Sequence, residues 1–173
     1  MKEENRKIIE ELPFLQFKVW DPEVEKYVPN EKIDGTQLDC LPAGWRTLAV
    51  EMFRKIRDRL IEEGGQDAVD NFMIDQLKEK FGEIRLYAHP TSDEVENIIS
   101  EYERKSADVC CCCGKRATRV SKGWICPFCD DCHPDWWTAD AETLDSDDRY
   151  VRIDRSSENG MDDASAAALG YHL

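Results

Sequence analysis

Seven of the eight cysteines in this 173-residue chain lie between residues 110 and 132. Residues 110–113 are four consecutive cysteines, and a second group consists of Cys126, Cys129 and Cys132. A Cys-x-x-Cys pair brackets a tight turn that presents both sulfurs on one side, and two such pairs about 12 to 20 residues apart form a tetrahedral thiolate site. The segment therefore predicts a metal site made of four thiolates.

Spacing alone does not decide which two residues form the second pair of ligands. If Cys126 and Cys129 are the second pair, 12 residues separate it from the first group. If Cys129 and Cys132 are the second pair, 15 residues separate the two, which is the usual lower end for a four-cysteine ribbon. We favour the longer spacing, and Cys126 and His133 remain competing ligands. The favoured set combines this pair with the outer cysteines of the first group, whose turn Gly114 allows to close: Cys110, Cys113, Cys129 and Cys132.

Four thiolates are soft donors that close a tetrahedral shell, which favours Zn²⁺. A closed shell has no position for a water molecule, so we expect the zinc to be structural and to stabilise a small lobe that has few apolar residues. The chain has no glycine-rich phosphate loop, and its three histidines are scattered. We identify no catalytic constellation and predict that the protein is not an enzyme.

Charge indicates the kind of partner. The chain carries 23 Lys and Arg against 37 Asp and Glu, a net charge of −14. Residues 1–108 hold 16 basic against 25 acidic side chains, residues 109–133 hold 4 against 2, and residues 134–173 hold 3 against 10. Such an acidic surface repels nucleic-acid phosphates and attracts basic protein surfaces. The expected partner is therefore a protein with a basic surface.

The cysteine segment suggests an alternative partner, a nucleic acid. Basic side chains next to an aromatic one contact the backbone and bases of nucleic acids in many ribbon proteins. The candidate nucleic-acid contacts on this arm are Lys115, Arg116, Arg119, Lys122 and Trp124.

Apolar periodicity predicts an α+β fold, with a helix-rich body, a small sheet and a C-terminal zinc-ribbon lobe. We expect helices over residues 1–12, 44–63, 67–80 and 91–105. We expect strands over residues 14–20 and 83–88. Gly64-Gly65 is expected to end the second helix, and Thr91 with Glu94 to cap the last one. Phe81 is expected in the core, at a corner between helix and strand.

We divide the chain into a body (1–108), a zinc-ribbon lobe packed on the body (109–137) and an acidic, largely flexible tail (138–173). Trp136 and Trp137 are expected to pack the lobe onto the body. Tyr150-Val151-Arg152-Ile153 has the pattern of one edge strand. The chain has no apolar run long enough to span a bilayer and no signal peptide, so we expect a cytoplasmic protein without a membrane partner.

The sequence also resembles a set of short bacterial and phage proteins of unassigned function. The resemblance rests on residues 76–87 (QLKEKFGEIRLY), the CxxCG of residues 110–114, and Gly123-Trp124 leading to Cys129-x-x-Cys132. It covers about residues 45–132. It implies a zinc-containing α+β fold of prokaryotic or viral origin, and it favours Cys129 and Cys132 as ligands.

Together these observations predict a non-catalytic, zinc-stabilised acidic module that binds another protein. In its sharper form the hypothesis is a phage-encoded inhibitor, acting in the bacterial cytoplasm, that occupies a basic nucleic-acid-binding surface of a host defence or transcription protein. The alternative is a nucleic-acid-associated ribbon protein that binds through its basic arm.

Overall fold

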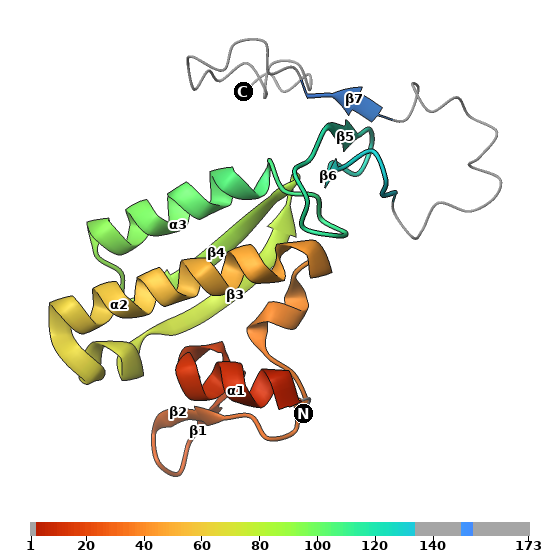
Figure 1. The fold of residues 1–173 in the computed structure, drawn as a ribbon. Coiled ribbons are helices and arrows are strands. Elements are labelled where there is room, and N and C mark those ends of the chain that lie inside the picture. Colours follow the sequence, from red (N-terminus) through yellow and green to blue (C-terminus); the bar gives the residue numbers. More distant parts are fainter. Residues whose placement is uncertain (1–2, 134–149, 154–173) are drawn as a thin grey trace.

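The computed structural model describes residues 3–133 and 150–153 (Figure 1). This part of the chain contains three α-helices and small antiparallel sheets, so the predicted α+β class is confirmed. The helices are α1 (Glu3–Glu11), α2 (Arg46–Asn71) and α3 (Asp93–Ser106). The strands are β1 (Lys18–Asp21), β2 (Lys26–Pro29), β3 (Met73–Lys80), β4 (Glu83–His89), β5 (Arg119–Ser121), β6 (Pro127–Phe128) and β7 (Tyr150–Arg152). Three 3₁₀ turns are η1 (Pro13–Leu15), η2 (Gln37–Cys40) and η3 (Ala43–Trp45).

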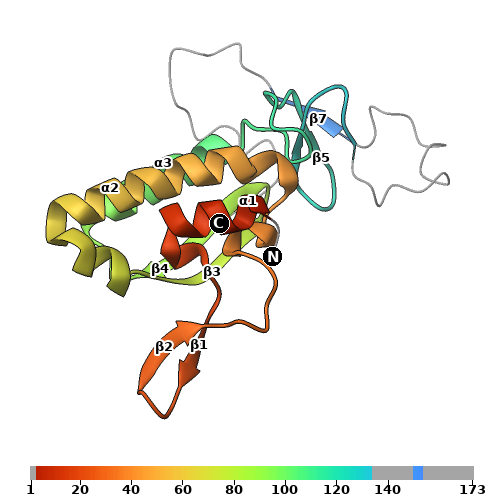
Figure 2. The ribbon, with the colours of Figure 1, turned by 60° about the horizontal axis from the view of Figure 1, so that its bottom comes forward.

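In the body, α2 and α3 run side by side along the long β3–β4 hairpin (Figures 1 and 2). The chain between α1 and α2 contributes to the same core. Phe14 of η1 packs against Phe53 of α2 and against Phe72, with ring centroids 5.8 and 5.1 Å apart. The predicted strand over residues 14–20 is thus a buried 3₁₀ turn followed by β1.

Helix α2 consists of two helical segments joined at a kink. Its apolar side chains recur every three or four residues, and the buried ones include Met52, Phe53 and Ile56. The expected break at Gly64-Gly65 is confirmed: Gly65 has a left-handed, non-helical backbone (φ 66°), and a second helical segment follows this kink and continues to Asn71. Neither α2 nor any other helix among the described residues is both long and apolar enough to cross a membrane.

The predicted helix over residues 67–80 is correct only as far as Asn71, because residues 73–80 form strand β3, which contains a bulge. Ile74 pairs with Ala88 and Gln76 pairs with Tyr87, so Asp75 is an extra residue in the strand. The bulge places Ile74 and Leu77 on the buried face although they are three residues apart. Three-residue spacing of apolar residues is also the helical pattern, and the sequence signal is therefore that of a helix.

Phe81 also lies elsewhere than predicted. Phe81 and Gly82 form the two-residue turn between β3 and β4, both with positive φ (54° and 81°), as a primed hairpin turn requires. The Phe81 side chain is 61% exposed at this tip and is not part of the core.

The predicted helix over residues 91–105 is present as α3, but its cap is one residue later than expected. The Ser92 hydroxyl accepts a hydrogen bond from the backbone N–H of Val95, so Ser92 is the N-cap. Thr91 instead donates to the carboxylate of Glu96 (2.6 Å).

Tyr102 joins α3 to α2, which gives a first prediction. Its side chain is fully buried and its hydroxyl donates to Glu51 (2.7 Å). Burial, followed by this hydrogen bond, raises the pKa of Tyr102 to about 12, from an ordinary value of 10.0. Because the folded state holds this proton more tightly, its contribution to stability is complete below pH 10 and is lost as the pH rises from 10 towards 12.

We expect Tyr102→Phe to lower the free energy of unfolding by about 1.5 kcal/mol at pH 8. The gap to wild type should narrow between pH 10 and about 12 because only wild type loses the proton-linked contribution. Urea unfolding at several pH values measures this. A gap that is constant with pH would contradict the role assigned to the buried hydroxyl.

The cysteine segment forms a lobe at one end of α3, around the small sheet β6–β5–β7 (Figure 1). Strand β7 is the predicted edge strand: Val151 pairs with Val120, and the backbone N–H of Ile153 donates to the carbonyl of Thr118 (3.0 Å). Residues 150–153 of the predicted tail therefore belong to the lobe. The expectations for Trp136, Trp137 and the rest of the tail fall outside the described residues.

Candidate metal centre

The first cysteine turn follows directly from α3. The backbone N–H of Cys110 donates to the carbonyl of Lys115 (2.7 Å), and the N–H of Gly114 donates back to the carbonyl of Cys110 (2.9 Å). Gly114 closes this turn with a left-handed backbone (φ 77°), a conformation that glycine adopts without steric cost. The turn brings Cys110 and Cys113 to one side, as the spacing predicts.

The second cysteine turn follows β6. The backbone N–H of Cys132 donates to the carbonyl of Cys129 (3.3 Å). The preceding Phe128 is held in the sheet because its carbonyl accepts from the N–H of Thr118 (2.9 Å). The antiparallel pairing of β5 with β6 thereby carries the second turn back to the first.

The sulfurs of the two turns meet. Cys110, Cys113, Cys129 and Cys132 place their Sγ atoms within 4.8 Å of one another, and the Sγ atoms of Cys113 and Cys129 are 3.6 Å apart. Metal–sulfur bonds of about 2.3 Å in a tetrahedron separate the sulfurs by about 3.8 Å. The donor set and its spacing thus fit one tetrahedrally coordinated metal ion. Among the described residues, these four cysteines are the group of Cys, His, Asp and Glu side chains with this geometry.

The electrostatics of the cluster also suit a cation. Burial raises the pKa of the Cys110 thiol, but the backbone N–H groups of Cys129, Cys113 and Cys112 point at its sulfur and lower the pKa overall, to about 7. Burial and the adjacent thiols of Cys113 and Cys129 raise the pKa of Cys132. One thiolate is therefore stabilised by amides, whereas four together require a compensating positive charge. A metal cation bound by the four sulfurs would supply that charge.

The competing ligands lie outside the four-sulfur group. Cys126 is buried, and its backbone N–H and carbonyl form hydrogen bonds with Ser121. Its thiol is free and forms a hydrogen bond with the thiol of Cys111. That bond, followed by burial, raises the pKa of Cys111. His133 is exposed, and its carbonyl accepts from the thiol of Cys112 (3.7 Å). The structure thus brings together the favoured second pair and assigns Cys111 and Cys126 to the interior of the lobe.

Part of the basic arm is engaged within the lobe. Arg119 donates to the carbonyls of Asp130 and Cys132 (3.2 and 3.0 Å), and its guanidinium lies 3.8 Å from the ring centroid of Tyr150. Lys115 pairs with Asp131 (3.0 Å). Arg119 and Lys115 therefore both support the second cysteine turn. The other arm residues of the alternative hypothesis, Arg116, Lys122 and Trp124, are exposed.

Residues at the start of α2 hold the first cysteine turn, and sequence reasoning missed this role. The N–H of Gly44 donates to the carbonyl of Cys111 (2.8 Å), and the indole N–H of the buried Trp45 donates to the carbonyl of Val109 (2.7 Å). A Cβ on Gly44 would lie 2.2 Å from the carbonyl oxygen of Cys110. Only glycine fits this approach of two backbones. The sequence signal was Gly44 immediately before an apolar helix, which we interpreted only as a helix start.

A second contact joins the body to the lobe. Gly82, at the tip of the β3–β4 hairpin, lies against Ile125 and Pro127, the segment that leads into β6. The buried core is accordingly continuous: it includes Trp45 of the body as well as Cys110 and Phe128 of the lobe. The lobe is therefore packed on the body from two sides.

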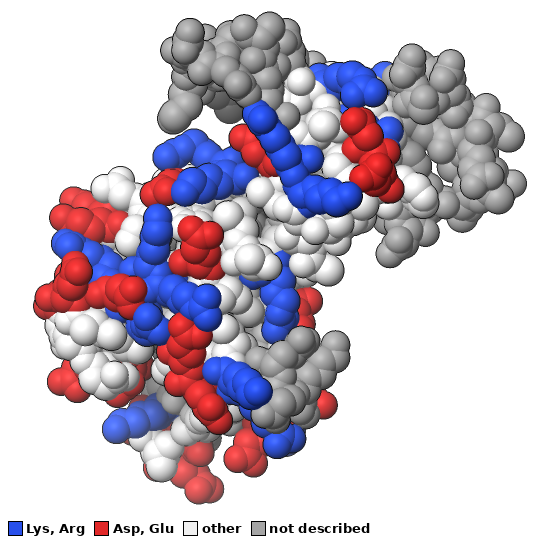
Figure 3. Space-filling view, in the orientation of Figure 1, with Lys and Arg blue, Asp and Glu red and all other residues white. Residues whose placement is uncertain are grey.

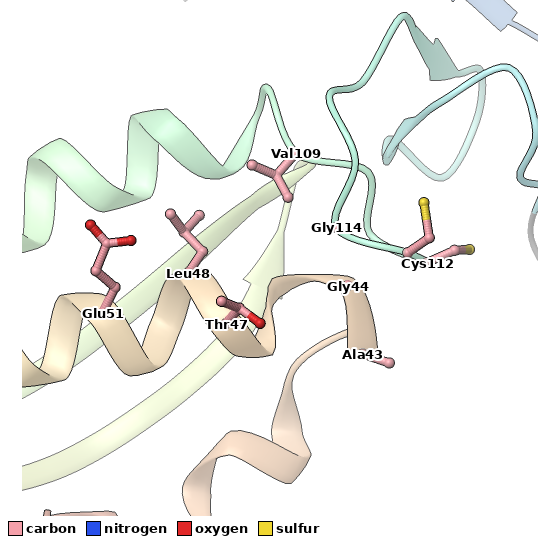
Figure 4. A pocket seen from close by; sticks show the side chains of 9 residues that line it. Ala43, Gly44, Thr47, Leu48, Glu51, Val109, Cys112 and Gly114 are labelled. Carbon is pink, nitrogen blue, oxygen red and sulfur yellow. The ribbon is translucent and has the colours of Figure 1, made fainter.

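A shallow pocket of about 360 Å³ lies between the start of α2 and the first cysteine turn (Figure 4). Thr47, Leu48 and Glu51 line it from α2, and Val109 and Cys112 line it from the end of α3 and the cysteine turn. Among the described residues it holds one carboxylate and no paired acid and base. It lies at the junction between body and lobe.

Comparison of the chain with models of known protein families, with curated proteins and with solved structures finds no match. Function must therefore be argued from the site itself.

Proposed function

We propose that this protein is a non-catalytic binding module whose lobe is shaped by a structural Zn²⁺ and whose acidic surface binds a basic surface of another protein. The observation that carries the proposal is the cluster of four cysteine sulfurs within 4.8 Å. Four thiolates complete a tetrahedral shell around zinc and leave no position for a reacting water molecule. The ion would then contribute folding free energy and no chemistry.

The charge of the body supports a basic partner. Many of its cations are already paired with carboxylates on the surface: Arg54 and Arg57 with Glu11, Arg59 with Glu63, and Lys105 with Glu101. Figure 3 shows the resulting mixture of basic and acidic side chains over the face formed by α2 and α3. With 16 basic against 25 acidic residues in positions 1–108, such pairing leaves a surplus of carboxylates. That surplus attracts a basic surface and steers its approach.

The specific form of the proposal is a phage-encoded inhibitor in the bacterial cytoplasm. Its acidic surface would occupy the basic nucleic-acid-binding surface of a host defence or transcription protein. The net charge of −14 and the resemblance to short bacterial and phage proteins support this form. An acidic protein competes for such a surface because the surface is already arranged to bind negative charge.

Affinity purification from bacterial lysate tests the proposed function. We expect the tagged, metal-loaded protein to recover a nucleic-acid-binding protein at about 50 mM salt and to lose at least about tenfold of it at 500 mM, because salt screens attraction between opposite charges. The purified partner should then lose binding to its nucleic acid when this protein is added. Recovery that is unaffected by salt, or a partner that still binds its nucleic acid, would contradict the proposal.

A second candidate function has one observation in its favour: Trp124 is 67% exposed and is two residues after the exposed Lys122 in the chain. An exposed aromatic and a cation are the elements of a single-strand contact. Gel shifts with single- and double-stranded probes separate the two candidates. Micromolar binding that is lost in an Arg116→Glu, Lys122→Glu variant would favour nucleic acid. Both substitutions avoid Arg119, which supports the lobe.

A further inference from the structure

The β1–β2 hairpin exposes an unusual amount of apolar surface for so small an element. Val19, Trp20, Val24 and Tyr27 are each between 46% and 55% exposed. Figure 2 shows that the hairpin projects away from α2 and from the β3–β4 hairpin. Single exposed apolar residues are normal on a protein surface, but a contiguous group of them marks a contact site.

The register of the hairpin shows how these side chains are arranged. Trp20 pairs with Tyr27, and their rings pack edge to face with centroids 5.3 Å apart. Val19 is the neighbour of Trp20 in the strand and therefore points to the opposite face. Apolar side chains are thus exposed on both faces, whereas a hairpin that served only to cover the core would bury one of them. This arrangement suits insertion between two walls of a partner.

The tip of the hairpin is acidic on balance, with three carboxylates against one cation, Lys26, which pairs in register with Asp21. Asp21, Glu23 and Glu25 lie in or beside the turn, and the Asp21 carboxylate accepts a hydrogen bond from the N–H of Glu23 (2.8 Å). Carboxylates around an aromatic wedge oppose the phosphates of a nucleic acid and favour ammonium and guanidinium groups. They also oppose a second copy of this acidic chain, which carries a net charge of −14. Charge complementarity therefore selects a basic protein.

We propose that the β1–β2 hairpin is the element that enters the partner, in an apolar groove bordered by Lys and Arg side chains. This inference rests on the proposed function and assigns its contact surface. Trp20 and Tyr27 form the buried centre of the interface, because aromatic side chains are enriched at such centres and carry much of the binding free energy. The carboxylates of the tip form its charged rim and accelerate association.

A Trp20→Ala, Tyr27→Ala double variant tests the proposal in the purification described above. We expect recovery of the partner to fall at least about 20-fold, because loss of two central aromatics costs that much or more. The matched control is Phe81→Ala, which removes an aromatic side chain of similar exposure from the tip of the other hairpin. The control should recover the partner as wild type does. Metal content and circular dichroism check that both variants are folded.

Photo-crosslinking identifies the occupant. With benzoylphenylalanine in place of Tyr27, we expect a crosslink to a partner peptide that contains Lys or Arg. A crosslink to nucleic acid or to a second copy of the chain would overturn the inference. If wild type recovers a partner and the double variant recovers it equally, the hairpin assignment fails while the proposed function stands. If wild type recovers no partner, both fail.

Discussion

Cys113→Ser is expected to reduce the metal content from about one ion per chain to less than about a tenth of that, and to unfold the lobe. The hydroxyl of serine stays protonated at neutral pH and cannot replace a thiolate ligand. Three sulfurs then remain where the structure brings four within 4.8 Å. Cys113 is exposed, so this substitution creates no cavity, and its effect on stability reports the metal site alone.

Cys112→Ser is the matched control, since Cys112 is an exposed thiol in the same turn but outside the four-sulfur group. Elemental analysis by mass spectrometry and thermal unfolding measure both variants. His133→Ala and Cys126→Ser test the competing ligands and should each retain about one ion, although Cys126→Ser places a hydroxyl at a buried position. A Cys113→Ser protein with full metal content, or a metal-free wild type with a folded lobe, would refute the site.

The metal site shows how far local spacing predicts structure. Cys110 and Cys113 could be paired from the sequence because they are three positions apart and are followed by Gly114, a pattern that defines one turn. From the sequence, Cys132 was favoured over Cys126 by the distance from the first turn and by the resemblance to short bacterial and phage proteins. The structure supplies the missing reason: Cys126 bonds to Ser121 through its backbone, and the next available turn begins at Cys129.

The body shows where periodicity misleads. Helices α2 and α3 and strand β4 follow regular patterns and were predicted close to their observed positions. Strand β3 was predicted as part of a helix from the spacing of Phe72, Met73, Leu77 and Phe81. The bulge at Asp75 disguises the strand further, because it puts Ile74 and Leu77 on one face at helical spacing. A bulge is defined by the pairing with β4, and a single segment of sequence does not contain that information.

Contacts between distant segments were beyond prediction for a related reason. Gly44 touches the turn that begins at Cys110, and the indole of Trp45 bonds to Val109, 64 residues along the chain. The local sequence pattern of each segment does not indicate that it contacts the other. In the structure these contacts make the metal lobe and the body share one core, so that a change on one side must be felt on the other.

Gly44→Ala tests that coupling directly. Its Cβ would lie 2.2 Å from the carbonyl oxygen of Cys110 and 2.7 Å from that of Cys111, and neither is a side chain that could rotate away. The start of α2 must therefore separate from the first cysteine turn. We expect the free energy of unfolding to fall by about 3 kcal/mol or more and the melting temperature by roughly 6 to 12 °C. We also expect weaker metal binding, because the turn that holds Cys110 is displaced.

Gly123→Ala is the matched control. It distinguishes the effect of the close approach between Gly44 and the first cysteine turn from a general effect of replacing a glycine in or near the lobe. Gly123 has a left-handed backbone (φ 82°) and open space where a Cβ would lie, so alanine there should cost only about 1 kcal/mol and leave metal binding unchanged. Thermal unfolding and competition with a chromogenic zinc chelator compare the two variants with wild type. If Gly44→Ala binds metal as tightly as Gly123→Ala does, the lobe holds its ion independently of the body. If it binds more weakly, the helix start at Gly44 is part of the metal site although it contributes no ligand.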